Sequence, residues 1–409
     1  MDKSKCLSLE GRIEKLFSDS FGRALYDDCC RIIKEFDMKK QIECGVLVGF
    51  SGGADSVMLL SFLYEYRRRN SLDFDISLCH VNHMIRGAEA LRDEEFSRSV
   101  AESLSLDITV ITRDIPVIAK EKGLGLEEAA RIERYSAFDK LLEEKGLGVV
   151  AVAHNASDNA ETVIFNILRG SGLKGGCGIP PKRDNIIRPL LYVSSDSIRE
   201  SLIRHKIDFV KDSTNDGLDY TRNYLRHVVI PSFEKVNSDP IESFTRFSSS
   251  LRKDEEYISE RADEILSQLP NADNIAKDKL SELPFALFSR VLSKLVKNAG
   301  GFQPSSMQLN KAYELLKGDN FKINLPGRIS FECQRGVCSV LKEVTQVDFS
   351  DFRVPLHMGI NRICGFSADV IILDNDSDKS FLNVYKYSIQ TELPFDIIND
   401  GLFLRFRKD

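Results

Sequence analysis

The sequence predicts an α/β protein: a parallel sheet with covering helices, then a mainly helical domain and a small β-rich C-terminal region. In the first half, apolar β-branched runs alternate with helix-period runs, which is the pattern of βαβ units. From about residue 240 helical runs dominate, and short strand-like runs follow near 321–342. We therefore expect three domains, spanning residues 1–235, 236–345 and 346–409.

The elements follow in order. An N-terminal helix is expected at 9–38. The expected strands are 43–50, 76–81, 108–112 and 149–154, and the helices after them are 56–68, 93–105, 126–146 and 157–169. Further helices are expected at 241–268, 284–298 and 304–317, and a hairpin turn at Arg335-Gly336. Ligands of such sheets bind at the carboxyl ends of the strands. Three of these strands end at or next to a candidate residue: the first at Ser51, the second at His80 and His83, and the fourth at His154. We therefore expect these residues to meet in one crevice.

Bulk composition narrows the functional class. The net charge of −6 argues against a general nucleic-acid coat, but it allows a local basic groove. Nine cysteines without a CxxC pair indicate reduced thiols and a cytoplasmic protein. No run approaches 18 apolar residues, and the N-terminus lacks an apolar signal core, so neither a membrane span nor a secretory leader is expected.

The most informative segment is the glycine turn that ends the first strand. Two glycines at a helix N-terminus expose N–H groups to an anion, and Asp55 adds a hard oxygen. The lysine of the GxxxxGK[ST] loop is missing. A literal GxGxxG at Gly170, Gly172 and Gly175 follows a helix-like run, so we reject it. The alternative to a phosphate loop is a plain Gly-Gly turn with a Ser or Asp helix cap.

Several motifs in order resemble the tRNA(Ile)-lysidine synthetases, a family of pyrophosphate-loop ATP pyrophosphatases. They are SGGADS (51–56), HVNHMIRG (80–87), RDEEF (92–96), ARIERY (130–135), AHNASDNAET (153–162), LRGSGLKG (168–175), RPLL (188–191), DSTN (212–215) and TRNYLR (221–226). The resemblance implies an adenine-nucleotide α-hydrolase-like, Rossmann-like catalytic domain. It also implies an activity. ATP adenylates the wobble cytidine of tRNA(Ile) with a CAU anticodon, free L-lysine attacks C2, and lysidine changes the codon read from AUG to AUA.

The resemblance assigns the loop to ATP phosphates and Mg²⁺. The residues are Ser51, Gly52, Gly53, Ala54, Asp55 and Ser56, with Asp55 as the metal ligand and Ala54 completing the spacing. Electrostatic placement of charge should dominate such transfers.

Other candidates lie on the strand ends and nearby helices. His80 or His83 is expected to touch the nucleotide or base, unless both only anchor the loop. Arg86 is expected near a phosphate or the lysine carboxylate. Arg131 is expected near the nucleotide by resemblance, although Arg131 and Arg134 could also form a solvated helix face.

His154, Asp158 and Glu161 form the third group. Asp158 and Glu161 share one helix face, which suits a metal or the lysine amine, or else caps the helix dipole. The family usually has two successive acids, whereas Ser157 precedes Asp158 here, so a role that needs both is in question. His154 or Asp158 could be the general base, and spacing does not choose between them.

A set of cations completes the candidates. Arg188, Arg222 and Arg226 are expected at the tRNA backbone or the α-phosphate, with Arg222 in the catalytic group. Asn223 would read a base edge or cap a loop. Lys174 lies in a glycine-rich segment that could close over the site, grip RNA or remain a solvated loop.

Two other functions stay open. One is another adenylating tRNA-modifying enzyme such as a thiolase, although Cys79 and Cys177 near the crevice have no partner cysteine. The other is a non-catalytic nucleotide- or RNA-binding scaffold, against which the complete loop argues. The chain ends on GLFLRFRKD, where family members often continue with another β domain, so the tail is either naturally short or cut. The oligomeric state is open, with a homodimer as one option.

Overall fold

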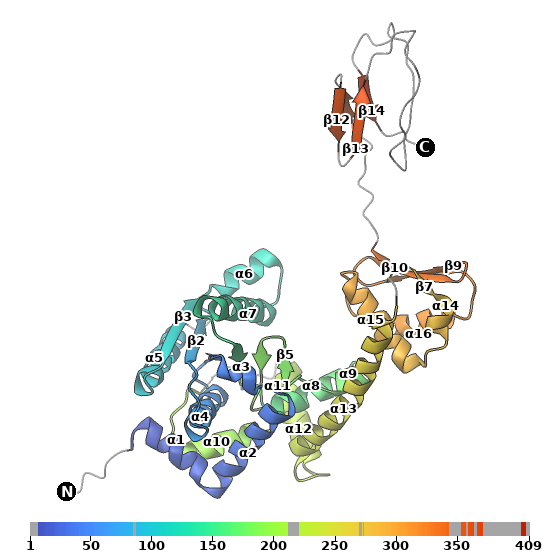
Figure 1. Cartoon of the computed structure of the whole chain (residues 1–409). Coiled ribbons are helices and arrows are strands. Elements are labelled where there is room, and N and C mark those ends of the chain that lie inside the picture. Colours follow the sequence, from blue (N-terminus) through green and yellow to red (C-terminus); the bar gives the residue numbers. More distant parts are fainter. Residues whose placement is uncertain are drawn as a thin grey trace, which may run out of the picture.

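The structure, a computed structural model, describes residues 7–84, 87–211, 221–269, 272 and 274–342, and four strands beyond them (Figure 1). The strands in the last group are β11 (Arg353–Leu356), β12 (Gly359–Ile363), β13 (Phe366–Val370) and β14 (Leu402–Arg405). They form two antiparallel pairs, β11 with β14 and β12 with β13. The α/β architecture, the helical middle and the later β strands agree with the predicted fold class.

A six-stranded sheet organises the first domain. Its strands are β1 (Val46–Gly49), β2 (Ile76–Asn82), β3 (Asp107–Thr112), β4 (Val149–Ala151), β5 (Lys182–Arg183) and β6 (Ile186–Ile187). Their order is β3-β2-β1-β4-β6-β5, and all neighbours are parallel except β5 and β6. Strand β2 pairs with one side of β1 and β3 pairs with β2, whereas β4 pairs with the other side of β1. The strand order therefore reverses between β1 and β4, where ligands of open α/β sheets bind.

Helices cover both faces of this sheet (Figure 1). They are α1 (Leu9–Ser18), α2 (Ser20–Glu35), α3 (Lys39–Glu43), α4 (Ala54–Arg69), α5 (Ala88–Ser103), α6 (Ile115–Lys122), α7 (Leu126–Lys145), α8 (Ala156–Leu168), α9 (Leu173–Gly176) and α10 (Ser195–Arg204). Val46 and Val48 belong to the larger core on the side of α4, whereas Leu47 packs with Phe138 of α7. This alternation buries β1 on both faces, which explains its wholly apolar sequence.

One expectation for this domain was wrong in detail, and one helix was missed. The single N-terminal helix at 9–38 is two helices that meet at Asp19, whose carboxylate accepts from Gly22 N (2.6 Å) and so starts α2. Helix α6 was not expected, yet Asp114 caps it and proline occupies its first turn.

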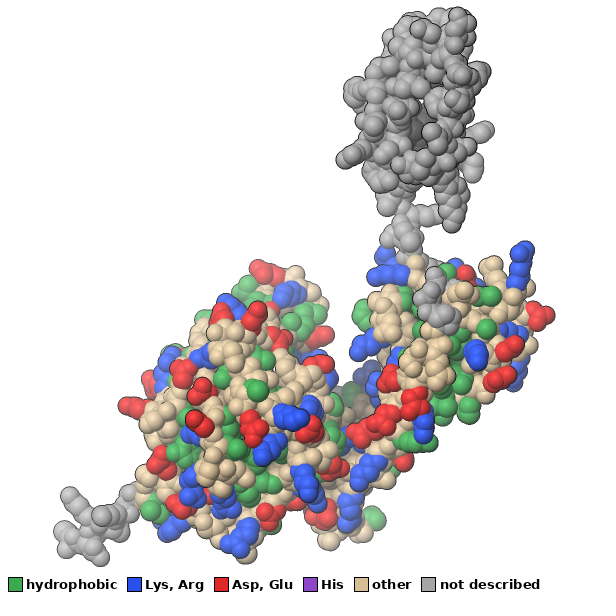
Figure 2. Space-filling view, in the orientation of Figure 1, with side chains coloured by type: hydrophobic (Ala, Val, Ile, Leu, Met, Phe, Trp, Pro, Cys, Tyr) green, Lys and Arg blue, Asp and Glu red, His purple; other side chains and the backbone are tan. Residues whose placement is uncertain are grey.

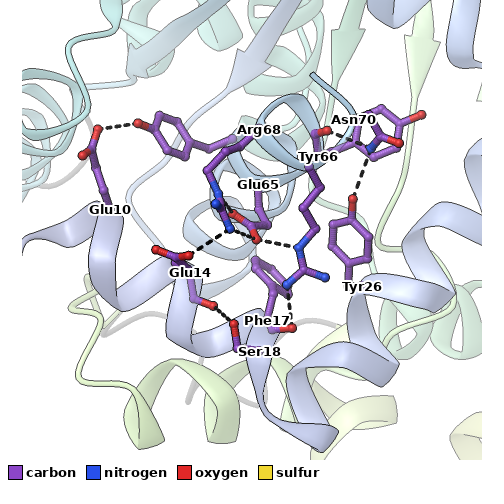
Figure 3. A network of polar contacts seen from close by, with 11 residues as sticks. Glu10, Glu14, Phe17, Ser18, Tyr26, Glu65, Tyr66, Arg68 and Asn70 are labelled. Atoms are coloured by element: carbon purple, nitrogen blue, oxygen red, sulfur yellow. Dashed lines mark hydrogen bonds and ion pairs between the residues drawn. The ribbon is translucent and has the colours of Figure 1, made fainter. Parts of the chain in front are cut away.

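A buried ionic cluster fixes the C-terminal end of α4 (Figure 3). Glu65 is 1% exposed and accepts hydrogen bonds from Arg68 and Arg69, with N–O distances of 2.6–2.8 Å. Burial opposes ionisation of Glu65, but the two arginines outweigh it and lower its pKa. Arg69 also donates to Phe17 O (2.8 Å) in α1. The helix that begins at the glycine turn is thus anchored to α1 at its far end.

The chain then enters a helical region. Its elements are α11 (Thr221–Tyr224), the π-helix η2 (Leu225–Val229), α12 (Ile230–Phe233), α13 (Pro240–Ser267), α14 (Lys277–Ser281), α15 (Phe285–Asn298) and α16 (Ser306–Leu315). Helix α13 packs against α8 and α9 at one end and against α15 at the other. Figure 2 shows the surface hollowed between the sheet domain and the helical domain, with acidic and basic side chains interspersed around it.

A second sheet closes the helical region. It comprises β7 (Ile275–Ala276), β8 (Phe321–Leu325), β9 (Ile329–Gln334) and β10 (Val337–Lys342), in the order β7-β10-β9-β8. Arg335 (φ 52°) and Gly336 (φ 76°) join β9 to β10. Two successive positive φ angles are the signature of a type I′ hairpin turn, so the predicted turn is confirmed.

Candidate functional site

A cavity of about 450 Å³ opens at the carboxyl ends of β1, β2 and β4. Its lining residues include Ser51, Gly53, Asp55, Ser56, His80, His83, Arg134, Tyr135, His154 and Asp158. The three strand ends singled out in the sequence therefore meet in one crevice. It lies at the point where the strand order reverses.

The glycine turn shapes one wall of this cavity. Gly52 has φ +81°, and a Cβ there would lie 3.1 Å from the Phe96 ring, so glycine is required. Ser56 Oγ donates to Gly53 O (2.9 Å) and lies 3.2 Å from Ser51 Oγ. Gly53 is the N-cap of α4, and no side chain caps this helix. The alternative of a side-chain cap is therefore not realised, and the first-turn N–H groups remain available to an anion.

Asp55 places a carboxylate beside these N–H groups. Its Oδ1 is buried and has no hydrogen-bond partner among the described residues. Burial, and then repulsion from Asp158, raises the pKa of Asp55 to about 6, while Asn155, Arg199 and Arg226 oppose the shift. An unsatisfied buried oxygen of this kind fits a hard cation such as Mg²⁺. No group of three or more His, Cys, Asp or Glu residues in the described part could hold a metal by itself.

Helix α8 supplies the opposite wall. Asn155 caps it by accepting from Ser157 N (2.9 Å) and Asp158 N (3.1 Å), and Asp158 Oδ2 accepts from Asn155 N (3.1 Å). This capping box is the structural alternative that the sequence left open for Asp158. Asp158 also lines the cavity, and its Oδ1 accepts from the guanidinium of Arg226.

Arg226 bridges the two acids of α8. It donates to Asp158 Oδ1 (2.9 Å) and Glu161 Oε1 (2.6 Å). Glu161 is almost fully buried, and burial raises its pKa despite this pairing. The nearby carboxylates raise the pKa of Arg226 against the effect of burial. Asp158 and Glu161 do share one face, as expected, but that face carries an internal cation.

Two histidines in the cavity wall are held in defined states. His80 Nδ1 lies 3.0 Å from Phe50 O, and a carbonyl oxygen only accepts, so Nδ1 carries the proton. Burial lowers the pKa of His80. Burial also lowers the pKa of His154 to about 4, and Arg188 Nε donates to its Nδ1 (3.3 Å). Both imidazoles are therefore neutral near pH 7.

The two candidate arginines of α7 lie in different surroundings. Arg134 lines the cavity with its Nη2 3.2 Å from His83 Nε2, whereas Arg131 lies over the Tyr135 ring (5.8 Å) and is not in the lining. Arg222 reaches Glu127 Oε1 at the start of α7 (3.1 Å). Because Arg131 and Arg134 are three residues apart on α7, the pattern could not decide which one faces the site.

The remaining candidates lie farther out. Arg188 is 3% exposed and also donates to Pro180 O (2.8 Å), so it supports His154 rather than meeting solvent. Lys174 is exposed on α9, and Asn223 is half-buried on α11. Arg86 lies outside the described residues. Sequence reasoning missed Asn155, although Asn followed three residues later by Asp is a recognisable capping signal.

The cysteines that the structure describes do not form a reactive centre. All cysteines in the described part of the chain are free thiols. Cys79 lines the cavity, but burial raises its pKa to about 12, so its thiolate is scarce at neutral pH. Separately, no described helix combines the length and apolar character needed to span a membrane.

Comparison with known proteins places these features in context. A family model described as a PP-loop domain matches residues 26–233. The chain is 30% identical over 399 residues to a tRNA(Ile)-lysidine synthase of Caldanaerobacter subterraneus subsp. tengcongensis, which covers 93% of this chain and 85% of the relative. Identity is 39% over 201 residues to the same-named protein of Pseudothermotoga lettingae, covering 49% and 44% of the two chains. Identity is 37% over 267 residues to a tRNA(Ile)-lysidine synthase of Clostridium perfringens, and the match covers 64% of this chain and 56% of the relative.

Proposed function

The chain belongs to the tRNA(Ile)-lysidine synthase family and carries its PP-loop ATP-binding domain, and from that premise we propose the following reaction. ATP adenylates the wobble cytidine of a CAU-anticodon tRNA(Ile), and pyrophosphate leaves. The amine of free L-lysine then attacks C2 of the base and expels AMP. The product, lysidine, pairs with A instead of G, so the tRNA reads AUA instead of AUG.

One observation carries the proposal: an uncapped helix N-terminus and an unsatisfied carboxylate face the same cavity. Bound ATP would satisfy the first-turn N–H groups of α4 with phosphate oxygens. Asp55 would hold Mg²⁺, which supplies positive charge to the departing pyrophosphate. His80 and Arg134 lie close enough to contribute to the nucleotide site, and we now favour Arg134 over Arg131 for that role.

The acids of α8 form the lysine side of the site in this proposal. Asp158 lines the cavity, and its charge attracts an ammonium group. The pKa of His154, about 4, is far below neutral pH and makes it a weak general base. We therefore propose that Arg188 and His154 hold one another, with His154 in the cavity wall, and that Asp158 orients the attacking amine. Arg222 and Arg226 would neutralise charge on the departing AMP.

We propose that RNA recognition uses the helical domain together with residues at the end of the catalytic domain. We propose boundaries at 1–235, 236–345 and 346–409, with the catalytic domain first and the helical domain binding tRNA in the cytoplasm. Lys174, Asn223 and exposed cations of the helical region would contact the backbone, which predicts salt-dependent affinity. The splayed base of a single-stranded anticodon loop suits a crevice at the strand ends.

The test is an omission experiment with the full chain. Pyrophosphate and AMP release, and incorporation of labelled lysine into tRNA, are measured with ATP, tRNA and lysine omitted in turn. Lysine incorporation should require all three, and Asp55→Ala should abolish it. Asp73→Ala removes an exposed acid after α4, outside the cavity lining, and is the matched control.

Other outcomes separate the alternatives. Sulfur transfer to tRNA would indicate a thiolase, and RNA binding without ATP cleavage would indicate a scaffold. Full lysidine formation by a correctly folded Asp55→Ala variant would overturn the proposed role of the loop.

A further inference from the structure

The glycine-rich segment 170–179 packs against the helical domain. Helix α9 within it packs against α13 (Figure 1). A Cβ on Gly176 would lie 2.6 Å from Leu251 Cδ1 of α13, and a Cβ on Gly178, whose φ is +66°, would lie 2.2 Å from Asn159 Oδ1. A side chain at Gly178 would be strained by the positive φ and would displace the Asn159 amide, and one at Gly176 would displace the end of the Leu251 side chain. Glycine at positions 176 and 178 therefore permits a close contact of this segment with α13 and α8.

A buried arginine reinforces this contact. Arg252 of α13 is 7% exposed and donates from Nη2 to Cys177 O (2.6 Å) and Ile179 O (3.0 Å). Its guanidinium also lies 5.7 Å from the Phe36 ring centre. No carboxylate of the described residues forms an ion pair with it. Burying an unpaired cation is unfavourable, so these carbonyl contacts hold a defined geometry between α13 and the segment.

Asn159 connects this contact to the helix of the candidate site. It is 2% exposed, and its Oδ1 accepts from Ile179 N (2.8 Å). Its Nδ2 donates to Ser248 Oγ of α13 (2.9 Å). Asn159 directly follows Asp158 on α8. One side chain therefore ties α8 both to the glycine-rich segment and to the first long helix of the RNA-binding domain.

We propose that Asn159 is a positioning residue through which α13 sets the orientation of α8 and its carboxylates, Asp158 and Glu161. The inference rests on the proposed function for its catalytic consequence. Docking of tRNA on the helical domain then bears on the active site through Asn159 and Ser248. A misorientation of catalytic groups by about 1 Å lowers rates by up to 100-fold, so small changes at this junction are measurable.

The test compares two buried serines in the full chain. Ser248→Ala removes the hydroxyl that Asn159 contacts. Ser61→Ala is the matched control, because Ser61 is also buried and its hydroxyl bonds only to Val57 O in its own helix (2.8 Å). We expect Ser248→Ala to lower kcat for lysidine formation about 10-fold with KM for ATP changed less than about 2-fold. Ser61→Ala should retain wild-type kcat at a similar Tm.

Two further measurements separate positioning from general damage. Asn159→Ala combined with Ser248→Ala should be no slower than Asn159→Ala alone, because the two variants remove one shared contact. Amide hydrogen exchange in 156–168 should increase about 3-fold or more in Ser248→Ala and not in Ser61→Ala.

The exchange measurement is independent of activity. If wild-type protein makes no lysidine, the proposed function fails, and exchange in α8 still decides the positioning inference. Unchanged exchange in α8, or equal kcat for the two serine variants in an active enzyme, would overturn it.

Discussion

Replacing Asp55 by asparagine should stabilise the metal-free protein while abolishing lysidine formation. The pKa of Asp55 rises from 3.8 to about 6, chiefly because the carboxylate is buried and then because Asp158 is near. Such a rise corresponds to at most about 3 kcal/mol of unfavourable free energy for the ionised form in the folded state. Asparagine keeps the shape of the side chain and removes this charge.

The sign of the effect follows from proton linkage. The folded state binds the Asp55 proton more tightly than the unfolded state, so the penalty is absent well below pH 4 and complete above pH 6. At pH 8 without metal or nucleotide, Asp55→Asn should raise Tm by on the order of 6 °C. By pH 4.5 most of that difference should disappear.

The assay is thermal unfolding in a chelating buffer across this pH range, with Asp73→Asn as the exposed-acid control. Lysidine formation is measured in parallel at pH 8 with Mg²⁺ and ATP. A variant no more stable than wild type at pH 8, or a Tm difference independent of pH, would refute the reasoning about the buried charge. Retained activity would refute the role of Asp55 in the reaction.

Three other substitutions test separate parts of the structure. Arg226→Met leaves the α8 carboxylates unpaired and should lower stability by about 3 kcal/mol at pH 8 and by less at lower pH, because burial raises the pKa of Glu161; equal losses in unfolding curves at pH 8 and pH 5 would contradict this. Gly52→Ala should raise KM for ATP about 10-fold in steady-state kinetics, because the φ of Gly52 is +81° and an alanine there would force the loop to shift. An unchanged KM would contradict the proposed binding of ATP phosphates by this loop. Glu65→Ala should lower the free energy of unfolding by about 3 kcal/mol and leave kcat unchanged. The Glu14 side chain is 58% exposed, so Glu14→Ala should lower the free energy of unfolding by less than about 1 kcal/mol. Equal losses for the two variants would contradict the argument from burial.

The strands of the first sheet were predictable because burial on both faces leaves long β-branched apolar runs. β2 was expected at 76–81 and occupies Ile76–Asn82. The two-residue hairpin was predictable because Arg335-Gly336 separates strand-like runs by a fixed length. The break at Asp19 was missed because one capping residue interrupts an otherwise continuous apolar period. Strand order depends on packing between distant segments, which periodicity along the chain does not describe.

The sequence predicted that the candidate site residues lie at the ends of strands, but it did not predict which residues they form hydrogen bonds and ion pairs with. Arg226 and Glu161 are 65 positions apart, so no local pattern indicates that they pair. Helical spacing limited the choice to one face for Asp158 and Glu161. On α7 helical spacing could not decide whether Arg131 or Arg134 faces the cavity, because the orientation of that helix is set by its packing against β1.

The two helix N-termini that meet in the cavity support the proposal of a metal-bound triphosphate over that of a simple anion. Helix α4 has no side-chain cap, so its first-turn N–H groups can donate to an incoming ligand or to water. Helix α8 is capped by Asn155 and Asp158, so its own carboxylate already occupies the positive end of the dipole. The wall formed by α4 therefore attracts negative charge. The wall formed by α8 carries the negative charge of Asp158, which raises the pKa of Asp55. An anion alone would be held by α4 and repelled by Asp55 and Asp158. A triphosphate carrying Mg²⁺ offers both signs of charge in one ligand, so ATP should bind far more weakly in a chelating buffer than with Mg²⁺, and Asp55→Asn should remove most of that difference.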